Sequence, residues 1–272
     1  MFRLILSLTL VLTASTSFAG PKLYIFDCGY FKFDDISMFS LKADETDVRE
    51  MFVPCYLIEH ENGRLLWDGG LPIEMAGKPM HYERPGAQVE YKRSVVDQLG
   101  DLGLSPEDIE LAAYSHFHYD HVGAANVFAG STLLIQQTEY DAAFLEPEKN
   151  PVFNPALYSE LKDSKKVILN GDHDVFGDGT VIIIAAPGHT PGHQTLLLKL
   201  ENTGPIMLSG DLYHFEASRA LRRTPVFNTN AEQTLRSFDK VEAILEETGA
   251  TLWIEHNKAL ADTLKKSPEY YD

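Results

Sequence analysis

The chain has 272 residues, a length that suits one sizeable α/β domain with a buried core. Its hydrophobic fraction of 44% and charged fraction of 23% are ordinary for a soluble globular protein. The 40 acidic side chains outnumber the 23 lysines and arginines, which gives a formal net charge of −17 at pH 7. An acidic surface repels phosphate backbones and anionic lipids, so a nucleic-acid partner is not expected.

The first residues have the pattern of a secretory signal peptide. Arg3 precedes an apolar run over 4–12, and the Ser-Phe-Ala sequence at 17–19 places small residues at the two positions that a signal peptidase inspects. The apolar run is too short to cross a bilayer comfortably, which favours a cleaved signal over a stable membrane anchor. We therefore predict a periplasmic or secreted protein, with a signal peptide over 1–19 and a single mature domain over 20–272.

Apolar runs bounded by turn residues predict a series of β-strands. In chain order they cover 22–27, 55–59, 64–67, 111–115, 133–136, 167–169, 181–186, 194–200, 206–209 and 251–254. The sequence also predicts helices over 88–99 and 230–248, the second ending at Gly249, and a short helix after the last strand. The stretch 71–85 has proline and glycine but no clear period, so we expect a long loop that acts as a lid or pocket wall. These elements predict a layered α/β fold in which helices cover a sheet-on-sheet core.

Two cysteines, Cys28 and Cys55, both lie in apolar surroundings. Export would permit a disulfide between them, but two buried free thiols fit the sequence at least as well. The sequence leaves their redox state open, because it does not show whether the two side chains meet.

The run His116-Phe117-His118-Tyr119-Asp120-His121 directly follows a predicted buried strand. On a turn that leaves a strand, imidazoles at i and i+2 can converge on one ion, and the next two side chains can face a second ion. Neutral and anionic ligands this close suit divalent metals, with zinc the default and cobalt, iron or manganese as alternatives. At this composition, chance would produce the pattern on the order of once in a thousand chains, so solvated or core histidines explain it poorly.

The run resembles the metal-binding motif of the metallo-β-lactamase superfamily, whose members supply further ligands from three later strand ends. His189 follows Pro187-Gly188, Asp211 follows Ser209-Gly210, and His256 follows the last predicted strand. The resemblance implies an αβ/βα sandwich of two packed mixed sheets flanked by helices. It also implies the ligands of two divalent ions: His116, His118 and His189 for the first, Asp120, His121 and His256 for the second, with Asp211 bridging them.

The remaining histidines and one aspartate receive other assignments. Asp68 ends a strand before Gly69-Gly70 and matches a position that supports the ligands in the superfamily. His193 begins the next strand after His189, so we expect it to support the site or to pack rather than to bind metal. The polar surroundings of three further histidines predict surface positions for His60, His81 and His173.

A two-metal site of this kind predicts hydrolysis. Two ions lower the pKa of a shared water, and Asp120 can position the nucleophile and then carry a proton to the leaving group. Among the branches of the superfamily, most β-lactamases lack either His121 or an aspartate at position 211. Glyoxalase II-type thioesterases carry a helical domain after the last ligand histidine, whereas only residues 257–272 follow His256 here. Nucleic-acid-processing members favour basic arms, and flavodiiron proteins need a flavin domain for which this chain has no room.

The segment 102–109 and the run 187–193 are similar to those of the N-acyl homoserine lactonases, the quorum-quenching branch. The resemblance implies that a metal-bridging hydroxide opens the lactone ring. In that family a tyrosine shortly after the bridging aspartate helps hold the lactone carbonyl, and Tyr213 and His214 are the two candidates here. Aromatic and apolar residues that could contact the acyl chain are Tyr30, Phe31, Phe33, Met51, Phe52 and Tyr119. Tyr119 is the strongest of these because ligands flank it, while ordinary core packing explains most of the others equally well.

Two alternatives stay open at this stage. One is an esterase, phosphotriesterase or β-lactam hydrolase on the same two-metal centre. The other is a non-catalytic metal-binding or ligand-binding protein of the same fold. In the leading interpretation the partner is a small molecule with an apolar acyl group, with no nucleic acid involved, and a homodimer is one option for the assembly.

Overall fold

The structure is a computed structural model that describes residues 20–272. The predicted signal peptide therefore lies outside the described residues. Across 20–272, no helix is both long enough and apolar enough to span a bilayer.

A large mixed sheet forms one layer of the molecule, with the strand order β4-β5-β1-β2-β3-β6-β7-β8 and with β14 paired to β1. Strands from β4 to β3 pair antiparallel, whereas β3, β6, β7 and β8 run parallel. The strands are β1 (Lys22–Phe33), β2 (Glu50–His60), β3 (Gly63–Trp67), β4 (Lys78–Arg84), β5 (Ala87–Tyr91), β6 (Leu111–Ala113), β7 (Thr132–Gln136), β8 (Lys166–Leu169) and β14 (Tyr270–Tyr271).

A smaller sheet packs against the large one, with the strand order β13-β12-β11-β10-β9. Its strands are β9 (His173–Asp174), β10 (Val181–Ala185), β11 (Gln194–Leu200), β12 (Gly204–Leu208) and β13 (Thr251–Trp253). Alternate residues of both sheets meet in a buried core that includes Ile25, Trp67, Ile183, Leu196 and Leu208. This burial accounts for the strongly apolar strand runs in the sequence.

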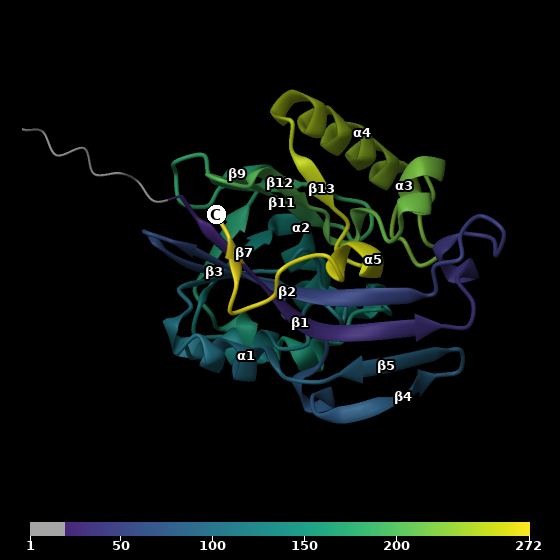
Figure 1. Ribbon diagram of the computed structural model, residues 1–272, viewed down its shortest axis with the longest axis horizontal. Coiled ribbons are helices and arrows are strands. Elements are labelled where there is room, and N and C mark those ends of the chain that lie inside the picture. Colours follow the sequence, from purple (N-terminus) through teal and green to yellow (C-terminus); the bar gives the residue numbers. More distant parts are fainter. Residues whose placement is uncertain (1–19) are drawn as a thin grey trace, which may run out of the picture.

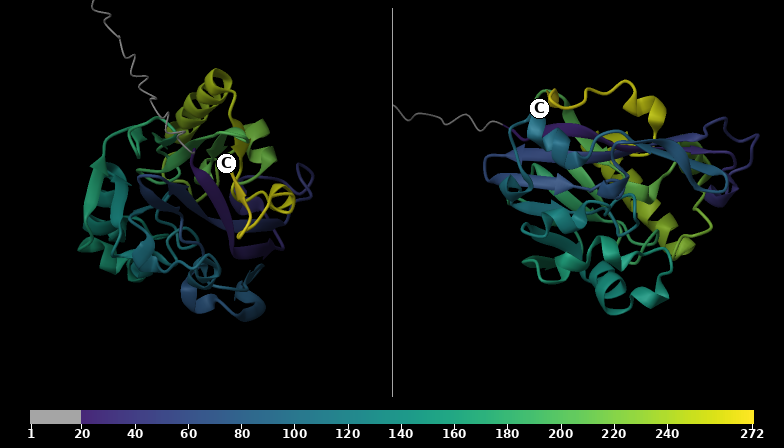
Figure 2. Two further views of the ribbon diagram at one scale, coloured as in Figure 1. Left: turned by 60° about the vertical axis from the view of Figure 1, so that its left-hand side comes forward. Right: turned by 90° about the horizontal axis from the view of Figure 1, so that it is seen from below.

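Helices cover the outer faces of both sheets. Helix α4 (Ala231–Thr248) packs Phe238 and Val241 against Ile184 and Met207 of the small sheet. Figure 1 and Figure 2 show α4 on the outside of that sheet, and Figure 1 shows α1 (Val95–Asp101) on the opposite side of the molecule. Three short helices complete the set: α2 (Gln137–Tyr140), α3 (Glu216–Leu221) and α5 (Lys258–Ala261). The expected sandwich of two mixed sheets flanked by helices is confirmed.

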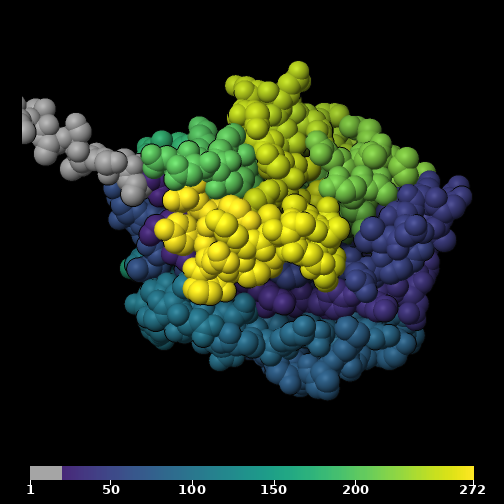
Figure 3. Space-filling model, in the orientation of Figure 1, coloured from purple at the N-terminus to yellow at the C-terminus, as the bar shows by residue number. Residues whose placement is uncertain are grey.

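The C-terminal segment lies over the strands at the start of the chain, as the yellow atoms in Figure 3 show. After α5 it returns along β1, where Tyr270 and Tyr271 pair with Tyr24 and Leu23. Leu264 and Tyr271 pack against the core between the sheets. The last residues therefore belong to the large sheet.

The predictions for 71–85 and 88–99 were wrong in part. Residues 78–84 form β4 rather than a loop, and nearly all of β4 is exposed, so it has no apolar period to detect. Residues 87–91 form β5 rather than the start of a helix, because Ala87, Val89 and Tyr91 alternate into the core. The helix begins only after Ser94, whose hydroxyl accepts a hydrogen bond from the Asp97 backbone in a capping box.

The expectation of a surface position for His60 was also wrong. The residue is buried, and its Nε2 lies 2.9 Å from Oδ2 of Asp178. Its ring stacks on Phe176 at a centroid distance of 4.1 Å. His60 ends β2, whereas Phe176 and Asp178 lie between β9 and β10, so this cluster joins the two sheets. His81 and His173 are partly exposed.

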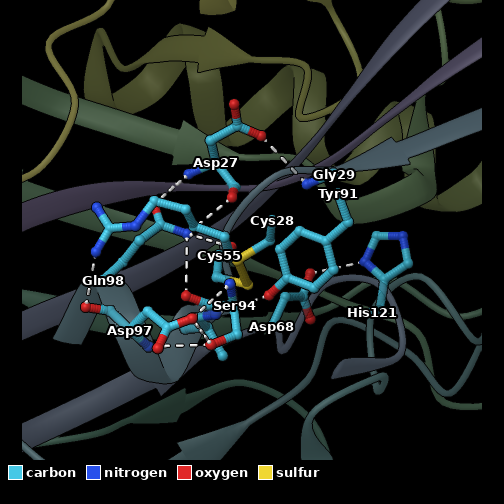
Figure 4. Close-up of a disulfide and its surroundings, with 12 residues drawn as sticks. Asp27, Cys28, Gly29, Cys55, Asp68, Tyr91, Ser94, Asp97, Gln98 and His121 are labelled. Atoms are coloured by element: carbon cyan, nitrogen blue, oxygen red, sulfur yellow. Dashed lines mark hydrogen bonds and ion pairs between the residues drawn. A yellow bond between two sulfur atoms is a disulfide. The ribbon is translucent and has the colours of Figure 1, made fainter. Parts of the chain in front are cut away.

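Cys28 and Cys55 form a disulfide between β1 and β2, which decides between the two states that the sequence left open. Figure 4 shows the bond beside the segment that carries Asp68. Gly70 lies against it with φ +65°, and a Cβ there would come within 2.3 Å of the Cys28 Cβ. Only glycine fits this contact, which places the Asp68-Gly69-Gly70 turn directly against the crosslinked strands.

Replacing both cysteines by alanine should lower the free energy of unfolding by about 3 kcal/mol, because the bond closes a loop between residues 27 positions apart. Urea unfolding of the oxidised wild type and of the Cys28→Ala/Cys55→Ala variant measures the difference. The reduced wild type serves as the control and should lose a similar amount. Equal stability of the oxidised wild type and the double variant would contradict the prediction.

Candidate metal centre

The seven predicted ligands converge where strands of the two sheets end. The run 116–121 follows β6, His189 follows β10, and His256 follows β13. Asp211 lies in the 3₁₀ turn Gly210–Leu212, which follows β12. All seven side chains are buried. Segments spread over most of the chain thus supply one site.

The ligand atoms form two groups. His116, His118, His189 and Asp211 make one, and Asp120, His121 and His256 make the other, with the atoms of each group within 4.8 Å of one another. The two groups correspond to the two ligand sets that the resemblance implied.

Asp211 lies between the groups. Its Oδ2 is 3.2 Å from His189 Nε2 and 3.5 Å from His116 Nε2. Its Oδ1 is 3.2 Å from His121 Nε2 and 2.8 Å from His256 Nε2. Each carboxylate oxygen therefore faces one group of imidazoles, the arrangement that a bridging ligand needs.

Several polar atoms in these groups are buried and make no well-formed hydrogen bond, although some lie within ion-pair distance of one another: Nε2 of His116, His118, His121 and His256, and Oδ1 of Asp211. Burying so many imidazole nitrogens around one carboxylate, without well-formed hydrogen bonds, is unfavourable unless something else binds them. Imidazole nitrogen and carboxylate oxygen are suitable donors for zinc and similar divalent ions. The residues present therefore fit two metal ions.

The protonation states suit metal binding in the first group. Burial and the neighbouring imidazoles hold the pKa of His116 and His118 well below the usual value. Burial would raise the pKa of Asp211, but the surrounding imidazoles, His214 foremost, hold it well below its ordinary range. Neutral histidines and an ionised aspartate are the forms that bind cations.

In the second group, nearby carboxylates together have a larger effect on the pKa of His121 than burial has. Burial lowers the pKa of His121, but the carboxylates of Asp211 and Asp68 outweigh it and raise that pKa well above the usual value. This end of the site thus strongly attracts positive charge.

Hydrogen bonds at Nδ1 orient three of the imidazoles. Asp68 Oδ2 lies 2.8 Å from His121 Nδ1, the Phe52 carbonyl lies 2.8 Å from His256 Nδ1, and Asn228 Oδ1 lies 3.2 Å from His189 Nδ1. Asp68 also accepts from the Ser115 backbone and hydroxyl, at 2.6 and 2.9 Å. Such contacts leave Nε2 facing the site and fix the ring. Figure 4 shows the Asp68–His121 pair.

His193 supports the site through hydrogen bonds to the backbone near the ligands. Its Nε2 accepts from the Asp211 backbone N–H at 3.0 Å, and its Nδ1 lies 3.0 Å from the Ala186 carbonyl. It belongs to neither ligand group.

Two buried glutamates also support the site, and neither was predicted from the sequence. Glu139 on α2 accepts from the Phe117 backbone at 3.0 Å and from the Gly192 backbone at 2.7 Å. Glu255 accepts from Trp67 Nε1 at 3.2 Å and from the Gly210 backbone at 3.0 Å. Burial raises the pKa of Glu139 to about 7 and that of Glu255 to about 8. In the sequence, both glutamates stand just after predicted strands. Many acidic residues do so, and this position alone therefore does not identify them as part of the site.

A cavity of about 330 Å³ opens beside the ligands. Asp120, His118, Asp211 and His256 line one part of it, and apolar side chains line most of the rest: Phe31, Phe33, Met38, Phe39, Met51, Val152 and Phe227. Four residues of the predicted acyl-chain set line this cavity: Phe31, Phe33, Met51 and Tyr119. Tyr30 and Phe52 instead line a separate cavity of about 540 Å³, next to Lys258 and Lys266.

The structure separates Tyr213 from His214. His214 lines the cavity, and its Nε2 lies 3.0 Å from Asp211 Oδ2. Tyr213 is fully buried, and its hydroxyl donates to Glu242 on α4 at 2.8 Å. Of the two, His214 is the side chain that a ligand in the cavity could reach.

Comparisons with known proteins agree with this geometry. The model of the Metallo-beta-lactamase superfamily matches residues 48–248. The N-acyl homoserine lactonase AttM of Rhizobium johnstonii is 35% identical over 243 residues, covering 82% of this chain and 88% of that protein. The N-acyl homoserine lactonase AiiA of Bacillus thuringiensis subsp. kurstaki is 26% identical over 224 residues, covering 79% and 85%.

The fold also matches a solved structure of a B. thuringiensis AiiA variant with N-decanoyl-L-homoserine bound at the active site. The TM-score is 0.78 at 25% identity, and the match covers 93% of this chain and 99% of that one. The sequence match, the fold and the ligand groups together show that this chain is a hydrolase of the metallo-beta-lactamase superfamily.

Proposed function

We propose that the protein is a dinuclear metal-dependent lactonase that opens the ring of N-acyl homoserine lactones. The observation that carries the proposal is the Asp211 carboxylate, which lies between two buried imidazole groups at the end of an apolar cavity. Relatives at 26–35% identity bear the name N-acyl homoserine lactonase, which supports this substrate class over other esters.

When bound, two divalent ions, with zinc the default, supply a nucleophilic hydroxide near neutral pH and Lewis acidity toward the carbonyl oxygen. His116, His118 and His189 would hold one ion, Asp120, His121 and His256 the other, and Asp211 would contact both.

Asp120 and His214 both line the cavity, and we propose that they act on the substrate. Asp120 lines the cavity with its Oδ2 3.8 Å from His256 Nε2, where it can orient the nucleophile and pass a proton to the departing ring oxygen. His214 Nε2 lies 3.0 Å from Asp211 Oδ2; with Asp211 bound to the ions, its N–H would be free to donate to the lactone carbonyl oxygen, which gains charge as the carbonyl is attacked. Phe31 and Tyr119, whose ring centroids lie 6.1 Å apart, give the acyl chain an apolar wall.

Ring opening releases a proton, so we expect chelator-sensitive acidification when the metal-loaded protein meets N-acyl homoserine lactones of short and long chain. A pH-indicator assay measures it, and adding zinc back after chelation should restore the rate. The His118→Ala variant should show no measurable turnover, because it loses a ligand of the first group. Fast hydrolysis by the chelated protein or by the variant would overturn the two-metal mechanism.

His214→Phe should lower kcat by about 100-fold, because the variant loses the Nε2–H donor to the developing oxyanion. Tyr213→Phe is the matched control: it should keep kcat within about twofold and lower stability by about 1 kcal/mol, through loss of the hydrogen bond to Glu242. Both variants are assayed at equal metal content. A large loss of kcat in Tyr213→Phe alone would reverse the assignment.

We also propose that the protein is exported. The signal-like sequence over 1–19 and the Cys28–Cys55 disulfide support this, since such bonds persist in oxidising compartments. Fractionation of the producing cells should find a shortened chain that starts near Gly20 outside the cytoplasm. Full-length protein confined to the cytoplasm would contradict export.

A further inference from the structure

Arg84 lies at the rim of the site, at the end of β4. It lines the 330 Å³ cavity beside the ligands, and it also lines a neighbouring cavity of about 550 Å³. Tyr119 and Val152 are shared by the two cavities as well. A substrate that extends beyond the first cavity would therefore pass Arg84 on its way into the second.

The Arg84 guanidinium has little to bind within the protein. Over the described residues 20–272 it makes one hydrogen bond, from Nη2 to the Met38 sulfur at 3.1 Å. Every other arginine in that range bonds at least one oxygen atom. A thioether is a weak acceptor, whereas a guanidinium carries five N–H donors. Most donors of Arg84 thus stay available where the mostly apolar first cavity meets the second, which Glu74, Glu83 and Asn154 also line.

The two cavities are lined by no other basic side chain of the lysine or arginine type. Arg84 is the one lysine or arginine among their lining residues. The apolar wall suits methylene groups, but Arg84 would gain most from an oxygen acceptor, and hydrogen bonds from a charged donor are stronger than neutral ones.

We infer that Arg84 is a specificity-determining residue that binds a carbonyl oxygen of the acyl group, outside the lactone ring. The inference rests on the proposed lactonase function. The oxygen is either the amide carbonyl or a 3-oxo substituent, which share the same chemistry. Arg84 would then favour acyl homoserine lactones over lactones with a plain hydrocarbon tail.

The test compares wild type and Arg84→Met, which keeps an apolar stem without the donors. Substrates are N-octanoyl homoserine lactone, its 3-oxo analogue and γ-decalactone. For at least one acyl homoserine lactone, kcat/KM should fall about tenfold, mostly through KM, with γ-decalactone changed less than about twofold. A fall for both acyl substrates assigns the amide oxygen, and a fall for the analogue alone assigns the 3-oxo group.

Calorimetry with the ring-opened products of the same three lactones repeats the comparison without turnover and should show the same selective loss. Arg236→Met is the matched control, because Arg236 pairs with Glu232 on the exposed face of α4, and it should change neither measurement.

Equal losses for all three compounds, or no loss for any, would overturn the role of Arg84 while leaving the lactonase proposal standing. A metal-loaded wild type that hydrolyses no lactone would overturn the proposed function and this inference with it.

Discussion

The structure depends on a buried carboxylate, Asp211, held between two groups of imidazoles. Its two oxygens lie 2.8–3.5 Å from Nε2 atoms of His116, His121, His189 and His256. Removing so many polar groups from water is unfavourable unless cations and opposite charges compensate for it. Strand ends from both sheets must therefore meet at one place, and the sandwich is the architecture that brings β6, β10, β12 and β13 together there.

A layer of buried hydrogen bonds holds the ligand loops in that position. Glu139 joins the loop of His116 and His118 to the loop of His189, with one carboxylate oxygen for each backbone N–H. Asp68 orients His121, and the turn that carries it packs against the Cys28–Cys55 disulfide through Gly70. These contacts fix the distances between ligands before any cation binds, which is how supporting groups raise metal affinity.

The cavity divides the recognition of a substrate between two kinds of surface. One end carries the ligand Asp120 and, beside the ligands, His214, and in the proposed reaction charge would develop there as a carbonyl is attacked. The remainder is aromatic and aliphatic, so it favours a hydrocarbon chain, and Arg84 at the rim adds a donor to that surface. The negative net charge of the whole chain is compatible with such a ligand, because a neutral, partly apolar molecule is not repelled by it.

The residues by themselves determined the layered α/β fold, because buried strands are continuously apolar, and the candidate metal-binding run 116–121, because its ligands are closely spaced after a strand end. The later ligands His189, Asp211 and His256 followed from the resemblance to the superfamily. It did not reveal β4, which is nearly all exposed, or the burial of His60, which depends on Phe176 and Asp178 in the other sheet. Only the tertiary structure paired Cys28 with Cys55, gave Glu139 and Glu255 their partners, and turned Tyr213 toward Glu242 while His214 faced the cavity. These features are set by contacts between residues far apart in the chain, and local spacing carries no record of such contacts.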